Sequence, residues 1–359
     1  MSTYTIHPDI AKARTLPTDF YLGTAAFERS KESIFATAWH FLGHEGLVKE
    51  NEQCHPFTLA PYLLDEPVML TRKDKEIYCL PNVCTHRGNL LVKEPCKQTN
   101  LSCHYHGRQF ELDGSFKSMP EFAGVDYFPE PSDSLGKLSL EKWGNWLFTN
   151  LQKEADFESY FGEMQKRLEW LPLDRFIPRP DLDKEYTVKA NWALYCENYL
   201  EGFHIPFVHP ELNSVLDFSN YTTELYRYSS LQLGLAKNKE DAFKLPKNSP
   251  DFGKQITAFY FFVFPNLLFN FYPWGLSLNI VHPVSPELTR VTYLSYVSDE
   301  SLREKGAGSG LEQVELEDQE VVEALQRGIR SRFYGQGRYS VKREQGTHHF
   351  HRLIAEFMN

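Results

Sequence analysis

The chain has 359 residues, of which 42% are hydrophobic and 24% are charged, and its formal net charge is −10. This length accommodates two domains, and the composition is typical of a soluble globular protein. The negative charge argues against nucleic acid or an anionic membrane as a partner, and no apolar run is long enough to span a membrane.

The expected elements divide the chain into an all-β domain and an α+β domain. Residues 28–42 predict a helix that leads into a strand, and short strands with turn residues between them follow up to residue 150. The remainder predicts an antiparallel sheet with covering helices, which places the fold in the α+β class. The elements expected there are helices at 157–170, 192–202 and 311–327 and strands at 258–264, 267–272, 276–281 and 290–297. We expect the all-β domain to span 38–150 and the second domain to comprise 1–37 and 151–359.

Six cysteines are spread along the chain, with no secretory signal at its start. This usage favours metal ligation in a reducing, cytoplasmic compartment over disulfide bonds. Two cysteine–histidine pairs, Cys84 with His86 and Cys103 with His106, are separated by sixteen residues in the all-β domain. Two thiolates and two imidazoles can hold a [2Fe–2S] cluster, with sulfur on one iron and nitrogen on the other. Zinc is the alternative, but zinc fingers usually carry their cysteines and histidines as separate pairs. His104 competes with His106, which the spacing favours.

A second group of ligand-type residues contains His204 and His209, with Pro206 between them. On a continuous helix their separation corresponds to about 500° of rotation, so the two rings would not share a face. We expect Pro206 to end or kink the helix between them, which lets both imidazoles converge on one metal. Glu201 precedes His204 by three residues on the same predicted helical face, which suits a carboxylate that supports the metal ligand.

A carboxylate would complete the facial triad of an oxygen-activating Fe(II) centre. Asp318 lies on the apolar stripe of the last predicted helix, whereas Glu317 and Glu320 point elsewhere on the helical wheel. A carboxylate that faces the core must be paired or metal-bound to offset its desolvation. An ion pair with an arginine such as Arg330 is the alternative for Asp318, and burial as core histidines is the alternative for His204 and His209.

With both motifs in this order, the chain resembles the α-subunits of Rieske non-heme iron oxygenases over nearly its whole length. The resemblance implies a helix-grip catalytic domain and a head-to-tail homotrimer, in which the cluster of one subunit is coupled to the iron of its neighbour. Glu201 would be the acidic bridge to His106 across that interface, and Asn198 falls where the family has an active-site amide. The implied ligands are Cys84, His86, Cys103 and His106 for the cluster, and His204, His209 and Asp318 for the mononuclear Fe(II).

Within the family, the passages 196–209 and 317–328 and the end at 337–351 look most like choline monooxygenases, which hydroxylate a methyl-ammonium carbon. A quaternary ammonium substrate would need aromatic rings for cation–π attraction. Candidates on neighbouring strands are Tyr260, Phe262, Phe264, Phe271, Tyr272 and Trp274. Filling the core beneath the sheet is the alternative role for these rings. We interpret the tail histidines at 348, 349 and 351 as packing or surface features.

The resemblance implies an oxidoreductase that uses O2 to hydroxylate a small organic substrate. A choline-like or betaine-like quaternary ammonium compound is the candidate substrate. Because no nicotinamide or flavin fingerprint is present, the electrons should come from a separate NAD(P)H-dependent reductase or ferredoxin. One alternative is a ring-hydroxylating dioxygenase that acts on an aromatic acid or hydrocarbon. A Rieske electron carrier without catalysis and a zinc-binding structural module are the others.

Overall fold

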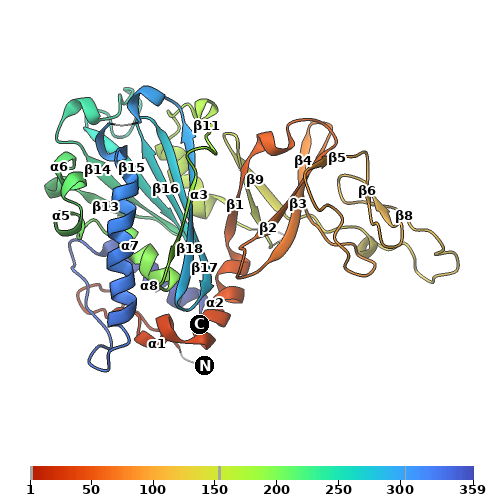
Figure 1. Cartoon of the computed structure of the whole chain (residues 1–359), viewed down its shortest axis with the longest axis horizontal. Helices are drawn as coiled ribbons and strands as arrows, with labels where there is room; N and C mark the ends of the chain where they lie inside the picture. The colour runs from red at the N-terminus through yellow and green to blue at the C-terminus, as the bar shows by residue number, and fades with distance from the viewer. Residues whose placement is uncertain (1–2, 153–154, 304) are drawn as a thin grey trace. The chain divides into compact units, whose positions relative to one another are not determined.

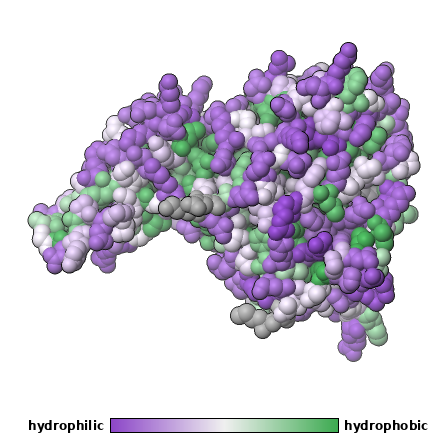
Figure 2. All heavy atoms as spheres, turned by 180° about the vertical axis from the view of Figure 1, so that it is seen from behind, coloured by the Kyte–Doolittle hydropathy of each residue, from purple (hydrophilic) through white to green (hydrophobic). Residues whose placement is uncertain are grey.

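The computed structural model describes residues 3–152, 155–303 and 305–359. The chain divides into two compact units, of which Phe35–Ala155 forms one and Met1–Ile34 with Asp156–Asn359 forms the other. On the face that Figure 2 shows, hydrophilic residues predominate and hydrophobic ones form small, separate patches. Among the described residues, no helix combines the length and the hydrophobicity that crossing a membrane requires.

The described residues of the unit Phe35–Ala155 form three small antiparallel sheets and three short 3-10 helices. Its elements are η1 (Phe35–Thr37), β1 (Trp39–His44), η2 (Glu45–Val48), β2 (Gln53–Leu59), β3 (Glu66–Lys73), β4 (Glu76–Pro81), β5 (Cys96–Lys97), β6 (Leu101–Ser102), β7 (Gln109–Phe110), β8 (Phe116–Ser118), η3 (Pro131–Asp133), β9 (Ser139–Trp143) and β10 (Trp146–Asn150). The strand orders are β1-β10-β9, β4-β3-β2-β5 and β6-β7-β8.

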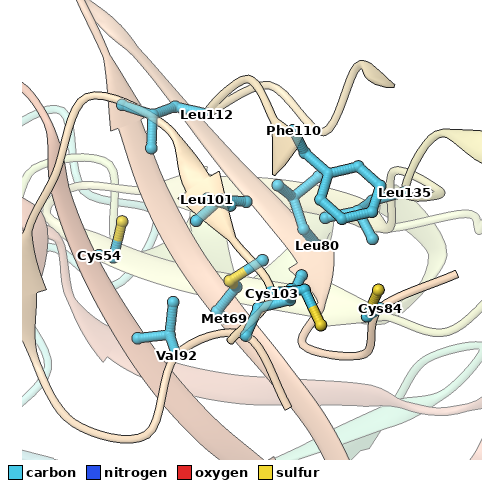
Figure 3. Packing of buried hydrophobic residues seen from close by; sticks show 11 residues of the cluster. Cys54, Met69, Leu80, Cys84, Val92, Leu101, Cys103, Phe110, Leu112 and Leu135 are labelled. Carbon is cyan, nitrogen blue, oxygen red and sulfur yellow. The ribbon is translucent and has the colours of Figure 1, made fainter. Parts of the chain in front are cut away.

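Strand β3 separates two hydrophobic clusters in this unit, because successive side chains of a strand point to opposite faces. Val68 and Leu70 pack into one cluster. Met69 packs into the other, which also contains Cys84 and Cys103 (Figure 3). The loops that carry the two cysteines are therefore anchored in a hydrophobic core.

The second unit contains one eight-stranded sheet with helices around it (Figure 1). Its helices are α1 (Thr18–Leu22), α2 (Thr24–Ser33), α3 (Glu158–Arg167), η4 (Leu173–Arg175), α4 (Trp192–Tyr199), α5 (Ile205–Val208), α6 (Pro210–Val215), η5 (Phe218–Asn220), η6 (Lys239–Asp241), η7 (Glu300–Leu302), η8 (Gly306–Gly308), α7 (Leu311–Gly328) and α8 (Gln345–Phe357). Its strands are β11 (Ile177–Pro178), β12 (Lys184–Val188), β13 (Thr222–Leu225), β14 (Ser229–Leu235), β15 (Ile256–Val263), β16 (Leu267–Tyr272), β17 (Gly275–Ser285) and β18 (Leu288–Val297). The order is β11-β18-β17-β16-β15-β14-β13, with β12 also paired to β18.

Successive side chains of β16 point to opposite faces of this sheet, and their contacts distinguish the two faces. Phe269 packs edge-on against Phe161 of α3, with the ring centroids 6.3 Å apart. Asn270 points to the opposite face, where it lies across from Tyr260 on β15 and Ser277 on β17. Helices α4 and α7 contact each other on that face, and α4 also contacts β17. A row of polar groups therefore faces the helices that carry the candidate site.

The predicted α+β class with antiparallel sheets is confirmed, and the four predicted strands and the last predicted helix are present. The helix expected over 192–202 ends earlier, at Tyr199. Pro206 lies in the first turn of the separate helix α5, so the prediction that it ends or kinks a helix between the two histidines is wrong. A proline is tolerated in the first turn because the N–H it lacks would have no partner within the helix.

Candidate active site

Two loops of matching conformation present the cysteine–histidine pairs of the unit Phe35–Ala155. In each loop the cysteine N–H donates to the carbonyl oxygen five residues later, at 2.9 Å for Cys84 and 2.8 Å for Cys103. The glycine four residues after each cysteine, Gly88 or Gly107, donates back to the cysteine carbonyl at 3.0 Å. These glycines have φ values of 72° and 74°, in the left-handed region that favours glycine.

The donor atoms in these loops fit a cluster held by two sulfurs and two imidazole nitrogens. The rings of His86 and His106 lie 4.8 Å apart and nearly perpendicular. Within the part of the chain that the structure describes, the Nδ1 atom of each ring is buried without a hydrogen-bond partner, which is costly unless another group binds it. Cys84 and Cys103 are buried and lie side by side at one end of their hydrophobic cluster (Figure 3).

Electrostatics near Cys103 favour the thiolate, which is the form that binds a metal. Burial opposes ionisation, but hydrogen bonds from the backbone N–H groups of Tyr105 and His106, together with those from the side chains of Cys84 and Asn89, lower the pKa of the Cys103 thiol. Asn89 also donates to the Cys103 sulfur, at 3.7 Å. This loop therefore stabilises negative charge where the cluster would bind.

Arg108 holds the two loops together, a role that the sequence motifs do not reveal. It is only 2% exposed, and it donates to Thr85 at 2.9 Å and to Asp133 at 2.5 Å. Its guanidinium also lies over three phenylalanine rings, those of Phe116, Phe122 and Phe128. A buried arginine needs such partners to offset its desolvation, and these contacts fix the position of the Arg108 side chain.

The structure brings His204, His209 and Asp318 together in the second unit. Oδ1 of Asp318 lies 3.0 Å from Nε2 of His209 and 3.5 Å from Nε2 of His204. One ligand atom from each of the three residues lies within 4.8 Å of the other two. His204 immediately precedes α5, and His209 separates α5 from α6, so both rings turn toward Asp318 on α7. Two imidazoles and one carboxylate fit a mononuclear iron with open coordination positions.

A carboxylate holds the far nitrogen of each of these imidazoles. Nδ1–H of His204 donates to Glu201 at 2.7 Å, and Nδ1–H of His209 donates to Glu317 at 2.7 Å. Each bond orients its ring so that Nε2 faces Asp318. Burial opposes a charge on His209, but Asp318 and Glu317 outweigh burial and raise its pKa. The group of carboxylates and imidazoles therefore suits a bound cation.

Two expectations about this helix face need correction. Glu317 is predicted to point elsewhere, but its long side chain reaches His209 from the position next to Asp318. Arg330, the alternative partner of Asp318, instead forms an ion pair with Glu287. Glu201 contacts His204 as expected, although the two residues lie in a non-helical segment between α4 and α5.

A cavity opens beside the three candidate iron ligands. Asn198 lines it, as do Asn270, Ser277 and Asn279 from the sheet. Five tyrosines also line it, namely Tyr195, Tyr199, Tyr221, Tyr260 and Tyr272. Three of these rings meet edge-on, with centroids 6.4 Å apart for Tyr199 and Tyr260 and 6.0 Å apart for Tyr260 and Tyr272.

Most of the other rings proposed for an aromatic cage fill the core instead. Phe262 and Phe264 pack against Phe350 of α8, at centroid distances of 5.4 Å and 6.0 Å. Phe271 lies on the face that α3 covers and contacts Phe176. The core-filling interpretation is therefore confirmed for these three rings, whereas Tyr260 and Tyr272 line the cavity.

The sequence pattern does not single out Glu315, one helical turn before Asp318. Its Oε2 accepts hydrogen bonds from Tyr195, at 2.7 Å, and from Tyr293. Burial, and then the charge of Asp318, raise the pKa of the Glu315 carboxyl to about 7. The three-residue spacing from Asp318, which places both carboxylates on one helical face, is the signal that could have found it.

The tail histidines pack inside the second unit, which confirms the packing interpretation. Nε2 of His348 lies 2.8 Å from the carbonyl oxygen of His7. His351 is fully buried, with Nε2 2.9 Å from Glu197 and Nδ1 2.5 Å from the Tyr339 hydroxyl. Glu197 belongs to α4, so this network ties α8 to the helix that precedes the candidate iron ligands.

These two sites define a class of protein, an oxidoreductase with an iron–sulfur domain and a separate mononuclear iron site. Residues 38–129 match the Rieske [2Fe-2S] domain, and residues 177–359 match the ring hydroxylating alpha subunit (catalytic domain). The chain belongs to the Rieske oxygenase family.

Relatives match over nearly the full chain. It is 28% identical to the chloroplastic choline monooxygenase of Arabidopsis thaliana, over 96% of this chain and 83% of that protein. It is 29% identical to the carnitine monooxygenase oxygenase subunit of Escherichia coli K12, over 96% of this chain and 94% of that protein. A solved quaternary ammonium Rieske monooxygenase has a TM-score of 0.76 and 25% identity, and the match covers 98% of this chain and 97% of that one.

The family confirms the predicted resemblance, the oxidoreductase class and both cofactors, a [2Fe–2S] cluster and mononuclear iron. A Rieske oxygenase needs a partner for electron transfer and a substrate. The catalytic-domain match contradicts the two alternatives without catalysis, the electron carrier and the zinc-binding module. The individual metal ligands and the catalytic roles of Asn198 and Glu201 stay predictions.

Proposed function

We propose that the protein is the oxygenase component of a monooxygenase that hydroxylates a carbon attached to a quaternary ammonium nitrogen. The observation that carries this proposal is the cavity beside His204, His209 and Asp318, whose aromatic lining consists of tyrosines. Faces of aromatic rings attract an ammonium ion, and amide and hydroxyl groups on the sheet suit a polar substrate tail. The names of the relatives, choline monooxygenase and carnitine monooxygenase, support the same substrate class.

In this proposal Cys84, His86, Cys103 and His106 hold the cluster, and His204, His209 and Asp318 hold the iron. The bound metals supply the electron transfer and the O2 reduction that oxygenation requires. Glu201 and Glu317 orient the two imidazoles, and the tyrosines position the ammonium group beside the metal site. Asn198 presents an amide to the substrate from the wall of the cavity.

Two partners complete the proposed system. A separate NAD(P)H-dependent reductase or ferredoxin supplies the electrons, since the sequence carries no dinucleotide fingerprint. The chain assembles as a homotrimer, in which Glu201 meets His106 of the partner subunit and couples the two centres. The structure of the solved quaternary ammonium monooxygenase reveals insights into inter-subunit electron transfer in that enzyme. This supports electron transfer between neighbouring subunits here.

An oxygen-uptake and product assay tests the function. The iron-loaded protein is mixed with a generic reductase and with choline, carnitine, a betaine or an aromatic acid in turn. We expect O2 consumption and an aldehyde or hydroxylated product with a quaternary ammonium compound. Oxygen uptake confined to aromatic substrates, with a cis-dihydrodiol as product, would instead support a ring-hydroxylating dioxygenase.

A further inference from the structure

We propose that Glu315 determines specificity in this cavity, as the counter-charge for a small cationic substrate that carries no carboxylate of its own. This inference rests on the function proposed above. Beyond that function, the inference identifies the side chain that recognises the ammonium charge and the members of the substrate class that the cavity favours.

The carboxylate of Glu315 is held in place by neutral groups. The hydroxyls of Tyr195 on α4 and Tyr293 on β18 both donate to Oε2. Within the described residues the structure gives Oε1 no hydrogen bond, and Glu315 lines the cavity. Both tyrosines are buried, at 5% and 7% exposure, so this carboxylate is fixed and retains one oxygen for a ligand.

The cavity wall carries three carboxylates, those of Glu201, Glu315 and Asp318. Among the residues described along it there is no lysine or arginine. Glu201 and Asp318 face the two imidazoles that would bind the metal, whereas Glu315, among the described residues, accepts hydrogen bonds from tyrosine hydroxyls only. Burial disfavours the ionised form of Glu315, and a bound organic cation would offset the cost of that charge. Tyrosine faces and one carboxylate are together the groups that recognise an ammonium ion.

A substrate carboxylate would find little positive charge nearby. Glu315 also borders a neighbouring hollow that contains Lys184 and Arg303. The same hollow contains Asp181 and Glu312, which balance those two cations. On the sheet, neutral amide and hydroxyl groups suit a hydroxyl-bearing tail. The charges therefore favour a monocation such as choline over a zwitterion such as carnitine.

Binding measurements on the full-length, iron-loaded protein test this inference. Calorimetric titrations compare choline with 3,3-dimethylbutan-1-ol, its uncharged isostere, and with carnitine. We expect wild-type protein to bind choline roughly tenfold or more tightly than either of the others. Glu315→Gln keeps the size of the side chain but removes the charge, so the preference for choline over the isostere should fall by about tenfold.

Glu320→Gln is the matched control, because Glu320 is an exposed residue of the same helix and should leave the preference unchanged. Tyr293→Phe is a second variant, which removes one donor and should lower the choline preference to a smaller extent. Iron content and circular dichroism report whether each variant is folded. If Glu315→Gln does not fold, the wild-type and Tyr293→Phe measurements still decide the question.

The results distinguish a failure of the role of Glu315 from a failure of the proposed function. An unchanged choline preference in folded Glu315→Gln, or tighter binding of carnitine than of choline by the wild type, would overturn the role of Glu315 alone. The quaternary ammonium function would survive both results. If the wild type binds neither cation and oxygenates only aromatic compounds, the proposed function and this inference fail together.

Discussion

At the scale of single residues, the carboxylates of the candidate iron site have two different roles. Asp318 faces the Nε2 atoms of both histidines, whereas Glu201 and Glu317 each hold an Nδ1 atom. The inner carboxylate can bind a metal, and the outer pair fixes the orientation of the rings. Removing an inner or an outer carboxylate should therefore give different results.

Asp318→Ala should remove the mononuclear iron and abolish oxygenation, because two imidazoles alone form a weak site. The cluster lies in the other compact unit, so its visible spectrum should be unchanged. Iron and acid-labile sulfide per chain measure both centres at once. Glu320→Gln on the same helix should retain the full iron content, and an Asp318→Ala protein with unchanged iron and activity would contradict the assignment.

Glu317→Ala should weaken iron binding by about 10- to 100-fold, the usual effect of removing a carboxylate behind a histidine ligand. Iron loss during dialysis against a graded series of chelator concentrations measures the change. Glu317→Gln, which can still accept the Nδ1–H bond, should lose less iron. Equal retention by wild type and Glu317→Ala would show that Glu317 does not position His209.

At the scale of elements, the candidate site depends on how closely α8 approaches the end of α4. Gly346 in the first turn of α8 has no side chain, and a Cβ there would lie 2.3 Å from the carbonyl oxygen of Leu200. Leu200 immediately precedes Glu201. The close contact therefore positions the non-helical segment that carries Glu201 and His204.

Gly346→Ala should destabilise the second unit by about 1–3 kcal/mol, because the added methyl group overlaps buried backbone. The displaced segment should also lower iron retention. Differential scanning calorimetry and iron analysis check both effects. Gly328→Ala is the control, since its Cβ would meet no atom within 4 Å, and it should leave both properties unchanged. A Gly346→Ala protein as stable as Gly328→Ala would refute the argument.

The four central strands β15 to β18 could be predicted because their apolar runs are long and end at turn residues, as in β16 (Leu267–Tyr272). The sequence pattern does not predict helix α8, since its histidines and glycine obscure the apolar face that it buries. The candidate metal ligands could be proposed from their residue types and spacing. The roles of Glu317, Glu315 and Arg108 could not, because they depend on contacts between residues far apart in the sequence.

At the scale of the whole molecule, two compact units each contain a complete candidate donor set for one metal centre. All residues of each donor set lie within one unit. Each centre should therefore load independently, and catalysis should depend on electron transfer between them. In the proposed trimer this transfer takes place between neighbouring copies.

Mixed oligomers test that arrangement. Cys103→Ser should lack the cluster and His204→Ala should lack the iron, so each variant alone should be inactive. Co-expressed subunits should recover part of the activity, because an intact cluster can then serve an intact iron site in the next copy. Light scattering should give about three times the 41.8 kDa chain mass. Mixed oligomers that stay inactive, or a monomer in solution, would contradict inter-subunit coupling.

A single-turnover experiment without reductase tests whether the two metal centres together oxygenate a quaternary ammonium compound. The iron-loaded protein is chemically reduced, freed of reductant and exposed to O2 in the presence of choline. We expect cluster oxidation, followed by its visible absorbance, to accompany formation of oxygenated product, and we expect Asp318→Ala to form none. If wild-type protein oxidises its cluster without converting choline or any other quaternary ammonium compound, the proposed function is wrong.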